Sequence, residues 1–182
     1  METTDINNEP GKANVPTSTI EEAIEERVEK FTQAQNTVNK YAAGSMAVGL
    51  VPIPLLDFVA LTSVQLQMLQ NLATQYDVEF SKEIVKPLIG SLLGGALPIT
   101  AAAPLASVIK VVPVIGQVSG MVSMAVLGGA GTYAVGKIFI EHFESGGTFL
   151  TFDPEKVREK FQAFYEKGKE FATAQTAQSA KS

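Results

Sequence analysis

The chain has 182 residues, a formal net charge of −5 at pH 7, no cysteine and a single histidine, His142. Its length suits one domain with a core large enough to be stable without disulfides, which the lack of cysteine excludes in any case. The acidic balance disfavours a nucleic-acid binder, which needs a clustered basic surface, and a lone histidine disfavours a zinc site, so we expect no metal or cofactor.

Charged side chains are distributed unevenly along the chain. Residues 1–40 hold eight acidic and four basic side chains and residues 137–182 hold seven of each, whereas the 96 residues between them hold four acidic and three basic ones. The first apolar run begins near residue 41, after an acidic segment, so a cleaved secretory signal with a basic start is not expected. Any membrane targeting must therefore come from internal segments.

The first predicted element is an amphipathic helix that begins near residue 17 and continues past Tyr41. Two overlapping Ser/Thr-x-x-Glu patterns in "STIEE" supply a capping box at its start. Apolar side chains follow with a period near 3.6 residues: Ile20, Ile24, Val28, Phe31, Val38 and Tyr41. Residues 1–16 and 173–182 are polar and are predicted to be disordered tails, so residues 17–172 form one predicted α-helical, membrane-associated domain.

Asp57 is the only charged residue over residues 41–76. It follows the sequence "VPIP", whose two prolines break the helix. A carboxylate at this place can cap the free amides of the next helix, predicted over residues 57–76, and lie at the positive end of its dipole. An ion or proton path is the alternative, because an ionisable group within an apolar segment is costly and often functional. The polar face of this helix consists of uncharged amides, which suit an interior or an interface.

Two longer uncharged runs follow, over residues 87–109 and 111–136, and Lys110 alone separates them. A bilayer core of about 30 Å needs about 20 apolar residues in a helix, so each run is long enough to span a membrane. Three lysines flank the outer ends of the pair, against one at its tip, which places both termini on the cytoplasmic side. The flanking lysines are Lys82, Lys86 and Lys137.

Small residues recur at spacings of four in these runs. The glycines that we expect to pack helices together are Gly90, Gly94, Gly116, Gly120, Gly128, Gly129 and Gly136. In water each glycine would weaken a helix by up to about 1 kcal/mol relative to alanine, whereas in lipid small faces let helix backbones approach closely. The pattern therefore favours a membrane-inserting helical hairpin. A soluble α-helical domain with a glycine-rich core is the alternative, since Pro98 and Pro104 interrupt the first run.

The last predicted helix begins after "HFESGGTFLTF", in which Gly146 and Gly147 end the preceding helix. Asp153 followed by Pro154 is a strong start signal, with a cap and then a proline at the first helical position. An apolar stripe follows: Val157, Phe161, Phe164, Tyr165 and Phe171. Core packing is the favoured interpretation of this stripe, and a partner groove or a membrane surface is the alternative.

Two patterns suggest enzyme chemistry, and neither is convincing. Residues 131–138, "GTYAVGKI", have the spacing of a nucleotide-binding P-loop, but Ile138 stands where the motif needs a Ser or Thr hydroxyl for magnesium. His142 lies between Glu141 and Glu144, which suggests a proton relay. No second histidine or nucleophile accompanies it, so contact with carbonyls or headgroups is favoured.

The segment "VPIPLLDFVALTSVQLQMLQNLATQYDVEF", with the later "LLGGALPI", "VVPVIGQVSG" and "GTYAVGKIFIEHFESGGT", resembles a bacterial family over residues 40–152. The family is the domain of unknown function numbered six-nine-seven, found in YcjF-type inner-membrane proteins and often fused to, or encoded beside, Era-like GTPase domains. The resemblance implies a helical, membrane-associated module that works with a GTPase and has no established catalytic residues.

These observations predict an all-α protein of helical hairpins. A glycine-rich hairpin is inserted in the bacterial inner or an intracellular membrane, and amphipathic helices flank it. We expect a non-enzymatic membrane adaptor that forms homo-oligomers through its small-residue faces and presents its terminal helices to a cytoplasmic partner, such as a GTPase. One alternative is a small channel or transporter component with Asp57 in a polar path. Another is a soluble helical homo-oligomer that buries the apolar hairpin. The expected partners are a lipid bilayer and protein, not nucleic acid.

Overall fold

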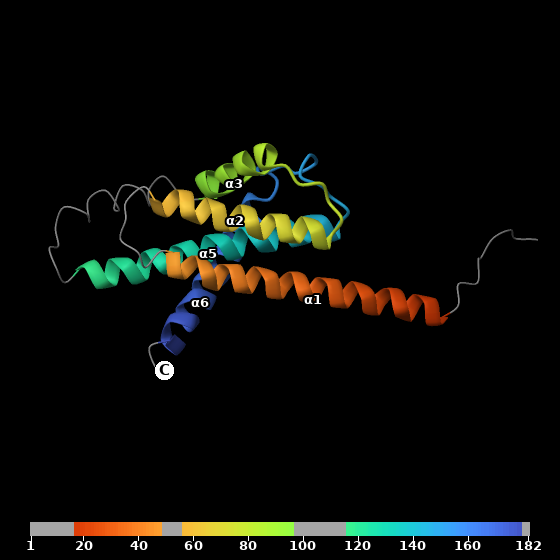
Figure 1. The fold of residues 1–182 in the computed structure, drawn as a ribbon, viewed down its shortest axis with the longest axis horizontal. Helices are drawn as coiled ribbons and strands as arrows, with labels where there is room; N and C mark the ends of the chain where they lie inside the picture. The colour runs from red at the N-terminus through yellow and green to blue at the C-terminus, as the bar shows by residue number, and fades with distance from the viewer. Residues whose placement is uncertain (1–16, 49–55, 97–115, 180–182) are drawn as a thin grey trace, which may run out of the picture.

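The computed structural model describes residues 17–48, 56–96 and 116–179, and Figure 1 shows their arrangement. Within these stretches the chain forms helices and no strand, which confirms the predicted all-α class. The helices are α1 (Thr17–Val48), α2 (Leu56–Gln75), α3 (Lys82–Ala96), α5 (Gly116–Glu144) and α6 (Arg158–Ser179). The turn of the predicted glycine-rich hairpin falls in residues 97–115, outside the described residues.

The central helix of the bundle is α5, which contacts each of the other four. α1 runs antiparallel to it, because a side-chain carbon built at Gly136 would meet Val38, whereas one at Gly129 would meet Met46. α2 lies beside α1, and α3 lies on the other side of α2 (Figure 1). α6 packs along α5 in the opposite direction over several turns, because Lys160 pairs with Glu141 whereas Phe171 stacks on Tyr133, nearer the start of α5.

Aromatic rings fill the core at the C-terminal end of α5. Phe139 is completely buried and stacks on Phe152, with ring centroids 4.4 Å apart. Phe149 packs against Phe139 at 5.3 Å and against Phe143 at 5.2 Å. Side chains of the predicted stripe on the last helix complete this core, since Phe161 is buried against it. The core-packing interpretation of that stripe is therefore confirmed.

Glycine ends α5 as predicted. Gly146 has a φ of +78°, which a glycine adopts without strain, and its N–H donates to the carbonyl of Phe143 at 2.9 Å. The N–H of Gly147 donates to the carbonyl of His142, also at 2.9 Å. These two bonds form a Schellman motif, which supplies partners for the last carbonyls of the helix. The chain then turns back toward the bundle and leads into α6.

Both ends of α6 differ from the prediction. Asp153 caps a turn over residues 154–157, where its Oδ1 accepts the N–H of Glu155 at 3.1 Å, so the helix itself begins only at Arg158. At the other end the helix continues to Ser179, although a disordered tail was expected from residue 173. The reason is that alanine and glutamine are good helix formers, and the completely buried Ala172 anchors this segment on the bundle.

The predicted membrane spans, residues 87–109 and 111–136, are only partly described. α3 includes ten residues of the first run, up to Ala96, and α5 includes the second run from Gly116 onward. Over the three described stretches, none of the helices has the length and apolar character needed to cross a membrane.

Candidate interaction surface

The N-terminal half of α1 carries a row of exposed apolar side chains, which we call the α1 stripe. Its members and their exposed fractions are Ile20 (48%), Ile24 (56%), Val28 (59%) and Phe31 (42%). The same face of the helix is completely buried further along, at Ala34, Val38 and Ala42. The difference arises because α1 projects beyond the end of the bundle (Figure 1). The α1 stripe is therefore a core-type face without a covering helix among the described residues.

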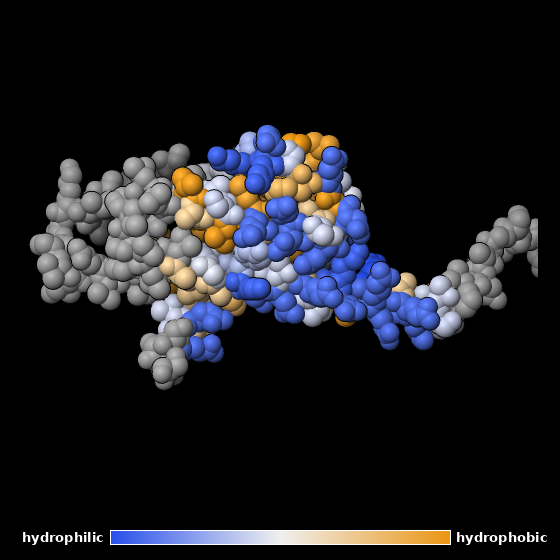
Figure 2. All heavy atoms as spheres, viewed as in Figure 1, coloured by the Kyte–Doolittle hydropathy of each residue, from blue (hydrophilic) through white to orange (hydrophobic). Residues whose placement is uncertain are grey.

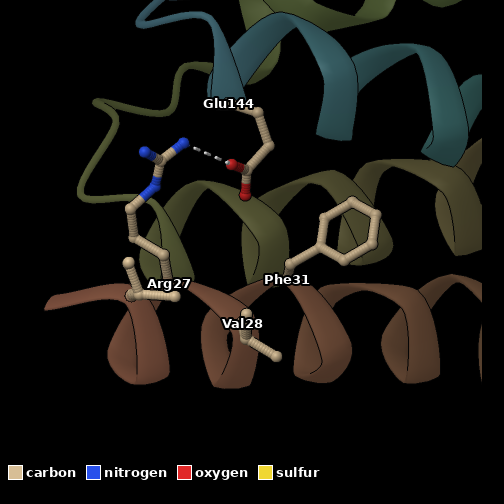
Figure 3. A pocket seen from close by; sticks show the side chains of 5 residues that line it. Arg27, Val28, Phe31 and Glu144 are labelled. Atoms are coloured by element: carbon tan, nitrogen blue, oxygen red, sulfur yellow. Dashed lines mark ion pairs between the residues drawn. The ribbon is translucent and has the colours of Figure 1, made fainter. Parts of the chain in front are cut away.

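A shallow, open pocket of about 270 Å³ lies where the α1 stripe meets the bundle (Figure 3). Its lining residues are Ile24, Arg27, Val28, Phe31 and Glu144. Glu144 is the last residue of α5 and pairs with Arg27, since its Oε2 lies 3.7 Å from Arg27 Nη2. An apolar floor with one ion pair at its rim suits the side chain of a docking helix.

Glu144 is held in place by a second partner. The hydroxyl of Tyr76 donates to Glu144 Oε1 at 2.6 Å, which links the end of α2 to the end of α5. Burial raises the pKa of the Tyr76 phenol, and the hydrogen bond to Glu144 and its negative charge raise it further. The carboxylate of Glu144 is thus oriented from the bundle side before any partner reaches the pocket.

The projecting half of α1 is acidic, with Glu21 and Glu25 beside the α1 stripe and the other glutamates on the opposite face of the helix. The glutamates of this segment are Glu21, Glu22, Glu25, Glu26 and Glu29. Its two basic residues point to the bundle, where Arg27 pairs with Glu144 and Lys30 Nζ lies 3.7 Å from Asp77 Oδ2. Among the ion pairs of the described residues, none involves these five glutamates. Figure 2 shows hydrophilic side chains over this projecting part of the molecule. The surface is therefore apolar along one line and acidic beside it and on the opposite face.

A buried polar cluster joins α1, α2 and α5 in the interior. Ser45 Oγ lies 2.8 Å from Thr132 Oγ1, and Gln65 Nε2 donates to the same Thr132 oxygen at 3.3 Å. All three side chains are completely buried, and Gln65 Oε1 has no hydrogen-bond partner among the described residues. At the last residue of α2, Gln75 Nε2 donates to Thr37 Oγ1 at 2.9 Å. Gln65 and Gln75 thus face protein, as the sequence pattern of α2 indicated, whereas Gln67, Gln70 and Asn71 are exposed.

Asp57 is the second residue of α2, so its backbone lies in the first turn of that helix. The helix begins one residue before Asp57, so this residue lies inside the first turn, where a carboxylate interacts favourably with the helix dipole, and not at the N-cap position that precedes the helix. The side chain lies outside the described part of the structure. Both its capping role and its role in an ion path therefore stay predictions.

Of the seven glycines singled out in the sequence, the five whose surroundings are described occupy three different environments. A side-chain carbon at Gly136 would lie 2.4 Å from Val38, and one at Gly129 would lie 2.7 Å from Met46, so both bring α5 close to α1. Gly128 makes a looser contact, 3.5 Å from the carbonyl of Ser45. Described atoms leave open space around Gly90 and Gly94. Gly116 and Gly120 lie in the first turns of α5, where side-chain surroundings are not described.

The two patterns that suggested enzyme chemistry have structural roles. His142 Nε2 donates to the carbonyl of Thr148 at 2.9 Å, and its ring packs edge-on against Phe152 at 5.1 Å. Residues 131–138 lie inside α5, where their backbone amides form helix bonds and cannot wrap a phosphate as a P-loop does. Within the described ranges, no group of three or more His, Cys, Asp or Glu residues is placed to hold a metal ion.

Sequence reasoning missed the residues that make the interior specific. Ser45 and Thr132 were visible only as small residues, although a polar residue among glycines and alanines is a signal for a buried hydrogen bond. Gly168 was not singled out, yet a side-chain carbon there would lie 2.8 Å from the backbone of Ala130. Its charged neighbours in "EKGKE" conceal it, because they point to solvent while the glycine faces α5.

Comparisons with known proteins identify the family of this chain. The chain is similar to Magnetosome membrane protein 22 of Magnetospirillum gryphiswaldense, with 36% identity over 140 residues, which cover 76% of this chain and 72% of that protein. No solved structure matches this chain. The family model described as a domain of unknown function, DUF697, matches residues 17–170, which span all five described helices except the end of α6. The chain therefore belongs to the DUF697 family.

Proposed function

We propose that this chain is a non-enzymatic, membrane-associated helical adaptor that self-associates and binds a cytoplasmic protein. The α1 stripe carries the adaptor role, because an apolar helix face that projects from a bundle is a typical protein-docking surface. A GTPase is the partner class that the family resemblance implies.

Membrane association draws on two observations. The similar protein from Magnetospirillum gryphiswaldense is named as a membrane protein. In addition, the last residue of α1, the first residues of α2 and α5 and the end of α3 lie at one end of the bundle (Figure 1). Residues 49–55 and 97–115 connect these ends, and their sequences contain one charged residue, Lys110. We propose that this end contacts a bacterial inner or intracellular membrane, with both termini on the cytoplasmic side.

Self-association needs small residues that the bundle does not already use. Gly129 and Gly136 are occupied by contacts with α1, so they do not serve a second chain. Gly90 and Gly94 lie on the open face of α3, and we propose that these two glycines contact a second chain in self-association. We do not extend the proposal to transport, since Gln65 and other amides of α2 bond between helices of the bundle.

Flotation of the purified full chain with lipid vesicles tests the membrane part of the proposal. Val112→Glu places a charge in the uncharged run 111–136, outside the described residues, and Val28→Glu is the matched control on the α1 stripe. A charge in a membrane helix costs up to about 2.5–3.5 kcal/mol at the centre and less near an end, so Val112→Glu, close to Lys110, should reduce flotation and Val28→Glu should not. Equal flotation of both variants, or no flotation of the wild-type chain, would contradict the proposal.

A further inference from the structure

We propose that the α1 stripe is the docking site for a basic amphipathic helix of a partner protein. This inference rests on the proposed adaptor function, because it names the chemical class of the partner. The docked helix lies along the projecting half of α1 and places one apolar side chain in the pocket beside Phe31.

The packing of α5 on α1 shows what this face accepts. Val38 and Ala42 of α1 meet glycines of α5, so a helix lies directly against them. The α1 stripe continues the same face for about three more turns, from Phe31 back to Ile20. α5 does not cover it, because α5 ends at Glu144, beside Arg27. A partner helix that starts past Glu144 would cover the α1 stripe in the way that α5 covers the rest. Its anchor side chain would enter the pocket at the junction.

The charge around the α1 stripe selects the occupant. The two basic residues of the segment are paired inside the chain, whereas its five glutamates form no ion pair within the described residues. A second copy would bring its own Glu21 and Glu25 against these and a second acidic segment beside the first, and an anionic lipid surface would be repelled by the same charges. A helix with lysine or arginine beside an apolar row would instead match both the shape and the charge.

Peptide binding to the full chain tests the proposal. The chain is reconstituted in neutral phosphatidylcholine bilayers, so that lipid charge does not attract the probe. The probe is a synthetic helical peptide with leucine at heptad a and d positions and lysine beside them. A scrambled peptide of the same composition and a peptide with glutamate in place of lysine are the controls. Binding is measured by fluorescence anisotropy at low and high salt.

The lysine peptide should bind, and Val28→Ser with Phe31→Ser should weaken binding about tenfold or more. Val59→Ser is the matched control, because Val59 is 61% exposed on another helix, against 59% for Val28. Replacing Glu21, Glu25 and Glu29 with Gln should weaken binding mainly at low salt. Far-UV circular dichroism should show an unchanged fold, since all these side chains are exposed.

Several outcomes would overturn the proposal. The scrambled peptide could bind equally, or the stripe variants could bind as the wild type does. A stripe variant that changes the mass of the assembly would assign the surface to a second copy, and one that loses vesicle flotation would assign it to lipid. Peptide binding that appears only after removal of residues 1–16 would assign the α1 stripe to this chain's own N-terminal segment. Failure of the wild-type chain to bind the lysine peptide, with its flotation intact, refutes this inference and leaves membrane association standing.

Discussion

Gly168→Ala tests how closely α6 packs on α5. The added methyl would lie 2.8 Å from both the Cα and the carbonyl oxygen of Ala130. These are backbone atoms, so no side-chain rotation can relieve the contact. α6 would have to move away by roughly half an ångström to restore ordinary van der Waals distances, and this would loosen the most extensive helix contact of the fold.

The expected magnitude is the difference between two effects. Alanine is favoured over glycine in a helix interior by about 1 kcal/mol, whereas adding a methyl to a tightly packed interface costs about 1–3 kcal/mol. The difference is about 0–2 kcal/mol, and we expect Gly168→Ala to lower the free energy of unfolding by the upper half of this range, about 1–2 kcal/mol, because the clash is with backbone. Gly90→Ala is the control, since open space surrounds Gly90 and only the helix preference of about 1 kcal/mol remains.

Urea unfolding followed by far-UV circular dichroism measures both variants. Gly168→Ala should lower the urea midpoint and Gly90→Ala should raise it, with unchanged slopes. In thermal unfolding each kcal/mol corresponds to about 2–4 °C for a domain of this size. Midpoints that move in the same direction, or a Gly168→Ala variant as stable as the wild type, would refute the packing argument.

Three further changes follow from the hydrogen bonds. Tyr76→Phe removes the donor to Glu144 and should lower the free energy of unfolding by about 1–3 kcal/mol at neutral pH. Because the pKa of the Tyr76 phenol is raised in the fold, its contribution to stability is complete below the ordinary tyrosine pKa and falls as the pH rises above it. Raising the pH from about 9 to about 11 should therefore lower the free energy of unfolding of the wild type more than that of Tyr76→Phe, as measured by urea unfolding at each pH. Equal losses in the two proteins would contradict this. Thr132→Val leaves the Gln65 amide without its partner and should lower the free energy of unfolding by about 1–3 kcal/mol. Gln65→Leu also removes the amide oxygen that has no partner among the described residues, so it should lower the free energy of unfolding less. The reverse order of the urea midpoints would count against the buried polar cluster. The pKa of Asp153 is lowered, first by the hydrogen bond from the Glu155 amide and then by Lys156. Its contribution to stability is therefore present above the ordinary aspartate pKa and is lost as the pH falls through the lowered value. Asp153→Asn should lose less stability than the wild type on acidification, and identical acid profiles would argue against the cap.

Local signals in the sequence located most helices well. The capping boxes and apolar period predicted a helix from about residue 17 to beyond Tyr41, and α1 runs from Thr17 to Val48. The helix predicted over residues 57–76 is α2, Leu56–Gln75. These signals work because a cap and a repeat of apolar residues act within a few turns and need no distant contact.

The functional surface depends on contacts between distant segments, which a local pattern does not contain. Ile24 and Val38 belong to the same apolar period, yet one is exposed and the other buried, because α5 covers only the second. Likewise Lys30 pairs with Asp77 of the α2–α3 loop, a contact that its neighbours in sequence could not predict. Gly136 and Gly90 look alike in sequence, although one packs against Val38 and the other borders open space.

Alkaline carbonate extraction of cell membranes tests membrane association most directly. Carbonate releases proteins held only by surface contacts and leaves inserted proteins with the lipid. We expect the full chain, expressed in a bacterium, to remain in the membrane pellet after extraction, and the Val112→Glu variant to be released in larger part. Complete release of the wild-type chain into the supernatant, with recovery as a monomer that ignores vesicles, would contradict the account.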